Sequence, residues 1–453
     1  MIALRHEINM KYSAVALACL FSVISYVNIY GQDINTIHDT LKISLPEVWA
    51  RAEEFSRTLD IKRKQVSIHH EEVRDAIMER YPELGIAGSA EKASNIPIYE
   101  NGLFSSPTQH EVIHTLYKVG TDFRLNVYDG NKLNLKIYEE RTLHLISQIQ
   151  KDEALSEIRY KSASLYLELQ KSLIYLKLIK EDIANQEKQL TEIRSFHKNG
   201  VVLKSDILRV ELDLSKRKML LVQIENDLLI DNQKLNIIIG QPDERTIRPD
   251  PILDSLSSDV DTYDACLQTA LMHSYSYHIS EQQTEVSKIR LKQVNANVRP
   301  KIGLYGDFYY ANPQIFLFPY NPYWYSLGIA GVKASFPISS LYHNKHKERG
   351  ARLELEKEEV AHKDTEDKVR QHVKEAYLRY KEALIQIDVA RVNVDQAVEN
   401  ARIIKDNYFN QTALITDLLD ADIQVLQTKF ELAGATIIAR NKYYMLQNII
   451  GIL

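Results

Sequence analysis

Two long stretches of this 453-residue chain, 131–197 and 351–411, contain neither proline nor glycine. Proline and glycine are the residues that most disfavour a helix interior, so both stretches predict uninterrupted helices. At 1.5 Å per residue, a helix over 131–197 would be about 100 Å long. No globular core is that wide, so we expect these helices to pack lengthwise as coiled coils rather than as an ordinary helical bundle.

Heptad spacing supports this expectation, because apolar residues recur at alternating intervals of four and three. One set is Ala376, Tyr380, Ala383, Ile387, Ala390, Val394, Ala397, Ala401, Ile404 and Tyr408. A second is Ile207, Val210, Leu214, Leu221, Ile224, Leu228, Leu235 and Ile238, with breaks at Arg217 and Asp231. A third is Leu418, Ala421, Val425, Leu432, Ala435, Ala439, Leu446 and Ile449, with breaks at Thr428 and Lys442. Such sets predict coiled-coil seams, and the many alanines allow close approach of the backbones.

The chain also repeats itself, because residues 197–240 align without a gap to residues 408–451, 211 positions later. This offset is too large for a solenoid unit of ~20–50 residues. It indicates a fold of two similar halves. We expect a first repeat at 32–242, an inter-repeat linker at 243–260 and a second repeat at 261–453.

Each repeat predicts the same order of elements: a helix, two β segments joined by a loop, a very long helix and a shorter helix. The expected ranges in the first repeat are 45–80, 82–88, 115–129, 131–197 and a helix ending at Gly240. Those in the second are 261–298, 300–311, 324–337, 340–407 and a helix ending at Gly451. The predicted fold class is therefore mainly α with a small β part, in duplicated halves.

The N-terminus predicts a secretory signal peptide over residues 1–31. Lys11 precedes an apolar run over 14–27, and Gly31 offers a small residue at a cleavage site. The alternative is an uncleaved membrane anchor, but the run is short for a membrane span. Cys19 lies inside the apolar run, which disfavours lipidation.

Downstream of this signal the sequence contains neither a stretch of ~20 apolar residues nor a second cysteine besides Cys266. An exported chain of this kind has no intramolecular disulfide, and any insertion into a membrane must use β-strands. Residues 301–310 and 324–336 alternate partly between apolar and small or polar side chains, as membrane strands of ~9–11 residues do. Aromatic residues cluster at one end, as an interfacial belt would: Phe316, Phe318, Tyr320, Tyr323, Trp324 and Tyr325.

The alternative for these β segments is a soluble hairpin with an aromatic core. Four strands cannot close a barrel, since the smallest have eight. Open sheet edges are prone to pair with other chains, so we expect the strands to be shared between protomers.

This arrangement resembles the TolC family of outer-membrane efflux channels over nearly the whole mature chain. Besides the duplicated architecture, the resemblance includes a turn motif: an aromatic residue, a small residue three positions later and an aspartate six further on. The two copies here are Tyr408, Gln411 and Asp417, and His197, Gly200 and Asp206. Gln411 departs from the usual glycine of this motif, and His197 departs from the usual aromatic residue.

The resemblance implies a homotrimer in which four strands from each protomer complete a 12-stranded β-barrel in outer-membrane lipid. The helices would continue the barrel as an α-barrel across the periplasm. It further implies a periplasmic adaptor (membrane fusion) protein and an inner-membrane pump as partners. The expected function is passive transport of drugs, ions or polypeptides, in efflux or type I secretion.

The resemblance also assigns roles at the periplasmic end. Asp417 and Asp420 match paired aspartates that ring the gate, and their spacing of three puts both on one side of a helix. Asp206 and Tyr408 match a pair that ties the two helical hairpins together. The family's latch arginine corresponds to Ala413 here, so the closed state is either looser or held by other contacts.

The remaining expectations at this end concern the turns and the alternative roles of the acids. Gly200 and Gln411 lie in the tip turns, where the adaptor would make contact. The alternative for Asp206 and Asp417 is helix N-capping, which does not exclude the gate roles. The alternative for Asp420 is a solvated helix face.

Other function classes lack support. The net charge is −5 with interleaved signs, so the chain has no basic footprint for nucleic acid. The dispersed histidines, His69-His70 and His343/His346 among them, predict no metal site, because we expect no partner carboxylate on their helical face. No catalytic or cofactor motif is visible, so we expect no enzyme. The alternative to a channel is a periplasmic coiled-coil structural protein that forms no pore.

Overall fold

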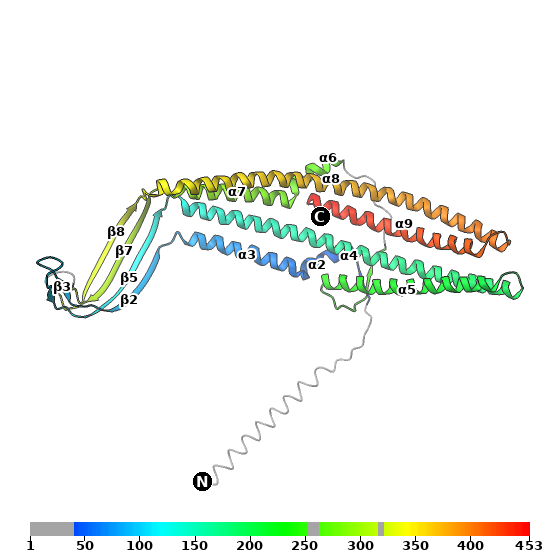
Figure 1. Cartoon of the computed structure of the whole chain (residues 1–453), viewed down its shortest axis with the longest axis horizontal. Coiled ribbons are helices and arrows are strands. Elements are labelled where there is room, and N and C mark those ends of the chain that lie inside the picture. Colours follow the sequence, from blue (N-terminus) through cyan, green and yellow to red (C-terminus); the bar gives the residue numbers. More distant parts are fainter. Residues whose placement is uncertain (1–39, 252–261, 316–320) are drawn as a thin grey trace, which may run out of the picture.

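The computed structural model describes residues 40–251, 262–315 and 321–453. The predicted signal peptide therefore lies outside the described residues, as do Phe316, Phe318 and Tyr320 of the predicted aromatic belt. In the described part, helices run side by side along the molecule and a four-stranded sheet extends from one end (Figure 1). The opposite end, formed by the turns 199–203 and 410–414, is called the tip.

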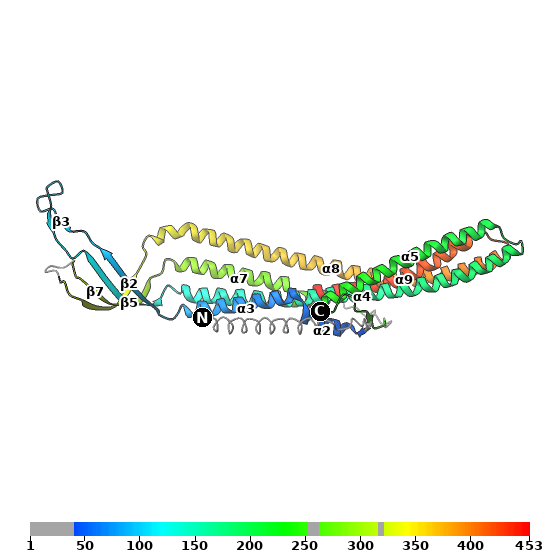
Figure 2. The same cartoon turned by 90° about the horizontal axis from the view of Figure 1, so that it is seen from below.

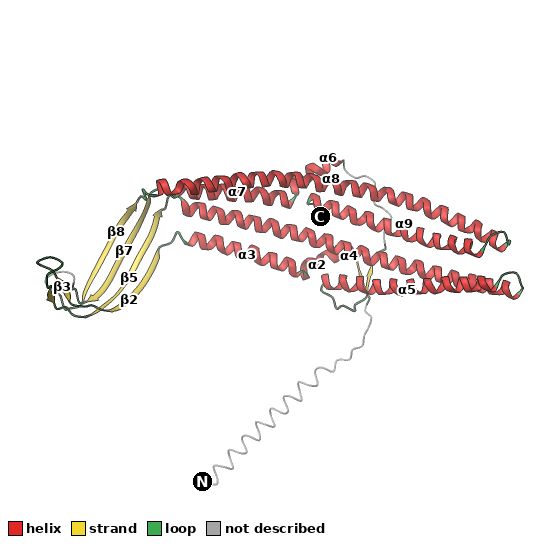
Figure 3. Ribbon diagram, viewed as in Figure 1, coloured by secondary structure: helices red, strands yellow, loops and turns green. Residues whose placement is uncertain are grey.

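Both halves contain the same sequence of elements, and the predicted fold class is confirmed (Figure 3). The first half comprises α2 (Leu45–Phe55), α3 (Arg57–Met78), β2 (Glu83–Lys92), β5 (Thr115–Tyr128), α4 (Lys132–Lys198) and α5 (Lys204–Ile238). The second comprises α6 (Tyr263–His273), α7 (Tyr275–Ala296), β7 (Lys301–Asn312), β8 (Tyr325–Ser335), α8 (Ser340–Phe409) and α9 (Ile415–Ile450). Two small additions are the hairpin β3 (Ile96–Ile98) with β4 (Thr108–His110), and the parallel pair β1 (Leu41–Ile43) with β6 (Ile247–Pro249).

The helices expected at 45–80 and 261–298 are each interrupted, which corrects the prediction of single helices. In both halves a helix of 11 residues is followed by one of 22, and a serine in extended conformation separates them. The Ser56 hydroxyl accepts the N–H of Leu59 at 3.3 Å and so caps α3. Ser274 occupies the corresponding break before α7.

The sheet has the order β2–β5–β7–β8, with every pair antiparallel (Figure 1). Directly paired residues share a face of a sheet, so the register assigns each side chain to one of two faces. One face is largely apolar: Leu84, Ile86, Val119, Phe123, Leu125, Leu304, Phe308 and Val332. The other carries charges: Lys118, Asp122, Arg124, Asp307 and Lys333. The apolar face is exposed in the protomer, with Leu84 at 78% and Ile86 at 83%.

The same side-by-side order of four elements extends along the whole molecule. In the half next to the sheet the order is α3–α4–α7–α8, and towards the tip it is α5–α4–α9–α8 (Figures 1 and 2). One free edge is therefore formed by β2, α3 and α5, and the other by β8 and α8. The described part of the chain is therefore a strip of four elements with two different open edges.

The predicted seams are buried between the helices. Alanines recur every seventh residue on the buried face of α8: Ala376, Ala383, Ala390 and Ala397. The two seam breaks in α5 are buried as well. Arg217 is 4% exposed and forms ion pairs with Asp182 of α4 and with Asp213, and the Ser172 hydroxyl donates to Asp231 at 2.8 Å.

None of the helices in the described residues is long and apolar enough to cross a membrane.

Candidate functional site at the tip

The two tip turns share one backbone geometry. The N–H groups of Gly200 and Gln411 each donate to the carbonyl three residues earlier at 2.9 Å, and those of Val201 and Thr412 donate to the carbonyl five residues earlier at 2.9 Å. This is the Schellman pattern of a helix C-terminus, which requires a left-handed residue after the cap. Gly200 has φ +75°, and Gln411 has φ +61°. Glycine adopts this conformation freely, whereas glutamine is strained there by about 1–2 kcal/mol.

Asp206 and Asp417 both cap the helix that follows their turn. The Asp206 carboxylate accepts the backbone N–H of Leu203 at 3.2 Å, and that of Asp417 accepts the N–H of Leu414 at 3.1 Å. An acid at the third helical position that reaches back to the N-cap satisfies a free donor and interacts favourably with the helix dipole. The capping role weighed from the sequence is therefore observed for both residues.

Asp420 lies on the exposed side of α9, one turn after the exposed Asp417. Within the described ranges, its carboxylate has neither a hydrogen bond nor an ion pair. Leu418, Leu419 and Ala421 point the other way, into the protein. The two carboxylates therefore share one exposed surface of the second hairpin, as their spacing predicted.

Tyr408 is buried, with 7% exposure, and its hydroxyl has no hydrogen-bond partner among the described residues. Burial raises the pKa of Tyr408, and the nearby negative charge of Asp206 raises it further. Asp206 is thus close enough to act electrostatically, but its carboxylate oxygens are used by Leu203 and Ser205. In this structure the predicted Asp206–Tyr408 tie is not a direct hydrogen bond.

Apolar contacts join the two hairpins near Ala413, the position of the missing latch arginine. Ala413 packs against a buried tip cluster that combines residues of α4, α5, α8 and α9. Its buried members are Ile179, Ile183, Leu190, Ile193, Val210, Leu214, Ile224, Tyr408, Ile415, Leu418, Leu419 and Leu426. The rings of Phe196 and Phe409 also meet, with centroids 5.4 Å apart. This contact was not predicted from the sequence, because it joins residues of two separate hairpins.

A polar contact between the hairpins lies deeper in the helical part. The Gln186 amide of α4 donates to the Asp422 carboxylate of α9 at 3.0 Å. One turn away, burial raises the pKa of Asp182, the ion pair with Arg217 opposes this shift, and the charge of Asp422 adds to it. Charged groups of both hairpins thus interact in this region.

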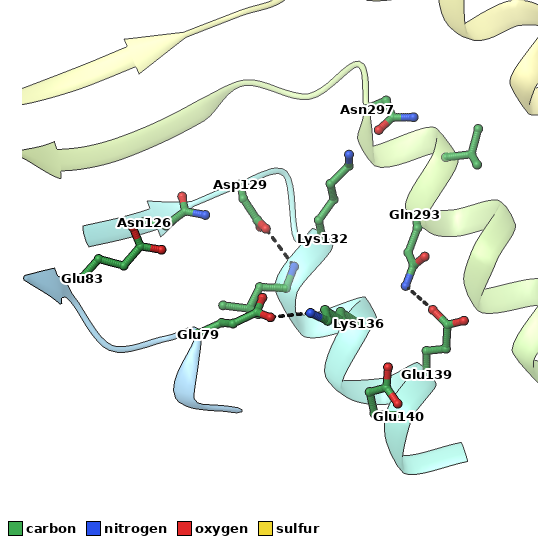
Figure 4. Close-up of a pocket in the computed structure, with 12 residues that line it drawn as sticks. Glu79, Glu83, Asn126, Asp129, Lys132, Lys136, Glu139, Glu140, Gln293 and Asn297 are labelled. Carbon is green, nitrogen blue, oxygen red and sulfur yellow. Dashed lines mark hydrogen bonds and ion pairs between the residues drawn. The ribbon is translucent and has the colours of Figure 1, made fainter. Parts of the chain in front are cut away.

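A second candidate site lies where the sheet meets the helices (Figure 4). It is a cavity of about 760 Å³ whose titratable lining is mostly acidic: Glu79, Glu83, Asp129, Glu139 and Glu140, with Lys132 and Lys136. Glu79 pairs with Lys136, and the Gln293 amide donates to Glu139 at 2.8 Å. Beside this cavity, His69 Nδ1 lies 2.6 Å from the Glu72 carboxylate. The expectation that no carboxylate meets His69 on its helical face is therefore wrong.

Solved structures provide the comparison, since the sequence itself matches no protein-family model and no curated protein. CusC, described for its transmembrane channel formation, matches with a TM-score of 0.77 at 14% identity, over 93% of this chain and 95% of that one. The outer membrane protein VceC of Vibrio cholerae matches with a TM-score of 0.72 at 15% identity, over 90% and 96%. The CmeC outer membrane channel of Campylobacter jejuni matches with a TM-score of 0.73 at 13% identity, over 90% and 85%. At these identities the likeness is one of fold, and it covers nearly the full length of each protein.

Proposed function

We propose that this chain, which has the fold of TolC-like outer-membrane channels, is one protomer of a trimeric exit duct of the outer membrane. The duct conducts solutes passively across the outer membrane and periplasm. The observation that carries this proposal is the strip of four elements with two different open edges. The resemblance seen in the sequence and the likeness of fold both support it.

Two different open edges favour a closed ring of protomers. Unpaired strand edges such as those of β2 and β8 are sites where another chain can add. Joining the β2 edge of one protomer to the β8 edge of the next is a heterologous contact, which closes when the rotation per subunit divides a full turn. Four strands per protomer require at least two protomers for a barrel. Three protomers would give the 12 strands that the resemblance implies.

The edge helices carry further apolar stripes that support the same contact. On α5 the exposed members are Leu208, Leu212, Met219, Val222 and Leu229. On α8 they are Leu378, Ile385, Val389, Val392 and Ile403. Their spacings fit heptad positions on a face other than the buried seam. We infer that α5 of one protomer packs against α8 of the next.

The two faces of the sheet fit a barrel wall. An apolar face this wide is unusual on a soluble surface, and it would turn outward to lipid. The charged face, with Asp122 directly opposite Asp307, would line a water-filled lumen. This division favours the outer membrane over a soluble hairpin.

At the tip, the exposed Asp417 and Asp420 would form the gate. Threefold symmetry would bring six carboxylates around a narrow opening, which favours cations. The tip cluster and the Phe196–Phe409 contact would hold the gate shut in place of a polar latch. Asp206 and Tyr408 would add to this tie through the electrostatic interaction between them. The Gly200 and Gln411 turns would present the contact surface for a periplasmic adaptor of an inner-membrane pump.

The ring contact can be tested with a charge pair across the two edges. Leu229 lies 25 residues from the start of α5, and Ile385 lies 24 residues from the end of α8, so the two are level along the tube. Leu229→Glu should reduce the trimer fraction in detergent, measured by light scattering, and adding Ile385→Lys should restore part of it. Gln223→Glu, on α5 outside the stripe, is the matched control. A trimer unaffected by Leu229→Glu, or a double variant no better than the single one, would reject this interface.

Conductance tests the duct itself. The purified trimer in a planar bilayer should conduct with cation preference, and Asp417→Asn with Asp420→Asn should weaken both that preference and the block by multivalent cations. Unchanged selectivity would reject the assignment of Asp417 and Asp420 to the gate, but the proposal of a duct would still stand. A stable trimer without conductance would favour the structural coiled-coil alternative.

A further inference from the structure

A compact group of side chains that could bind a metal lies on α3 and α4, in the half of the helices next to the sheet and far from the tip. His69 and Glu72 are three positions apart and so share one face of α3, and Glu140 approaches them from α4. One donor atom from each of the three residues lies within 4.8 Å of the other two. Around one zinc ion, ligand atoms at about 2.0–2.2 Å from the metal are roughly 3–4 Å apart. Small side-chain rotations would therefore bring the three donors onto one ion.

We propose that His69, Glu72 and Glu140 form a binding site for a divalent transition-metal ion such as Zn²⁺, which links α3 to α4. One imidazole and two carboxylates form a ligand set that suits zinc and its neighbours better than Mg²⁺ or Ca²⁺, which take oxygen ligands.

The Gln65 side chain holds the edge of the His69 imidazole that faces away from the Glu72 carboxylate. Its Nε2 lies 3.1 Å from the side-chain amide of Gln65, one turn earlier on α3. Without a metal, the Gln65 amide N–H donates to Nε2 and Nδ1–H donates to the Glu72 carboxylate. An ion at Nδ1 would displace that proton, and Nε2–H could then donate to Gln65 after a flip of its amide group. A hydrogen bond at the ring nitrogen that does not bind the metal typically orients a metal-binding histidine.

The electrostatics around Glu140 also favour a cation. Glu140 is partly buried and lies close to the negative charge of Glu72, while Lys136, one turn earlier on α4, is paired with Glu79. Glu139 is neutralised by Arg290 at 2.7 Å. Glu140 has no ion pair or hydrogen bond in the part of the chain that the structure describes. Because Glu140 also lines the acidic cavity, an ion can reach the group through it (Figure 4).

A second imidazole lies one turn along α4. The Nδ1 atom of His144 is buried without a hydrogen-bond partner among the described residues, and its ring lies 5.5 Å from that of His70. His144 follows Glu140 by four positions, so both lie on the α4 face that packs against α3. This side chain is a candidate for a fourth ligand.

Zinc titration of the full-length protein tests the proposal. The detergent-purified oligomer, stripped of metal with EDTA, should bind about one Zn²⁺ per protomer by isothermal titration calorimetry. The tip carboxylates are removed with Asp417→Asn and Asp420→Asn, so that zinc binding there does not contribute. In this background, His69→Ala and Glu140→Gln should each weaken binding at least about 100-fold, and Gln65→Leu about tenfold.

His343→Ala, which removes an exposed histidine of α8, is the matched control and should leave the affinity unchanged. Co²⁺ provides a second readout, since its visible absorption reports ligation directly and should be lost in Glu140→Gln, a change that preserves side-chain shape. Equal zinc affinity of the parent and His69→Ala proteins would overturn the site. So would a Co²⁺ spectrum that persists in Glu140→Gln.

Discussion

The two hairpins that form the tip, α4–α5 and α8–α9, occupy equivalent places in the two halves but are held together differently. At equivalent seam positions, 211 residues apart, the first hairpin buries Arg217 and the second buries Thr428. Arg217 pairs with two aspartates, whereas the Thr428 hydroxyl bonds only to carbonyls of its own helix. A buried charge must keep its partners, so it fixes how α5 lies against α4.

The second hairpin relies instead on close apolar contact, with a buried alanine at every seventh residue from Ala376 to Ala397 of α8. Close packing of small side chains stabilises a helix pair without a directional bond. The difference indicates that the first hairpin is the fixed part of the tip. The second, which carries Asp417 and Asp420, can shift at lower free-energy cost.

The largest effect is expected from removal of the buried charge of Arg217. Arg217→Ala leaves the partly buried carboxylates of Asp182 and Asp213 without their partner, so we expect a loss of about 3 kcal/mol in unfolding free energy. Urea denaturation followed by helical circular dichroism measures it. Thr428→Val at the equivalent position should change stability by less than about 1 kcal/mol. Equal shifts for the two variants would contradict the proposed difference between the seams.

A second test uses tyrosines at equivalent positions of the long helices. The buried Tyr166 hydroxyl donates to the Ile43 carbonyl at 3.1 Å and accepts the N–H of Asp250 at 2.8 Å. Burial raises the pKa of Tyr166 to about 12, and the Asp250 hydrogen bond opposes part of this shift. Because the pKa is raised in the folded state, its stabilising contribution is present below pH ~10 and is lost as the pH rises towards 12.

We therefore expect unfolding free energy to fall by about 2 kcal/mol more in the parent protein than in Tyr166→Phe between pH 10 and 12. Tyr377→Phe, at the equivalent and only partly buried position, is the matched control. Denaturation midpoints across this pH range measure the effect. Parallel curves for the parent and Tyr166→Phe would show that this hydroxyl is not the responsible group.

The smallest expected effect concerns the turns. Gln411→Gly relieves the left-handed strain and should stabilise the second hairpin by about 1 kcal/mol. Gly200→Ala should destabilise the first by a similar amount, for backbone reasons alone, because no atom lies within 4 Å of the added methyl group. Thermal denaturation of both variants measures these changes, and shifts of the same sign would refute the shared turn geometry.

The sequence predicted the long helices closely, because the absence of proline and glycine leaves few places to end them. The helix expected at 131–197 is observed at Lys132–Lys198. The breaks at Ser56 and Ser274 were not predictable in the same way, since helical sequence continues on both sides of each serine. The β1–β6 pairing was missed because both strands are short and lie about 200 residues apart.

At the tip, spacing alone predicted that Asp417 and Asp420 share a helix face. The contact between Phe196 and Phe409 depends on how two separate hairpins pack, and no local pattern indicates it. The same reason applies to His69 and Glu140, which come from different helices. Short-range geometry was therefore readable from the sequence, and contacts across elements were not.

The two different edges of the strip bear on how such a chain could evolve from single half-chains. A ring built from single half-chains would have six identical hairpins, so every change in one would appear six times. In the proposed trimer, joining two halves in one polypeptide would reduce the sixfold repeat to a threefold one. Neighbouring hairpins could then diverge, which allows three to acquire buried charges and three to acquire paired acids and an alanine seam.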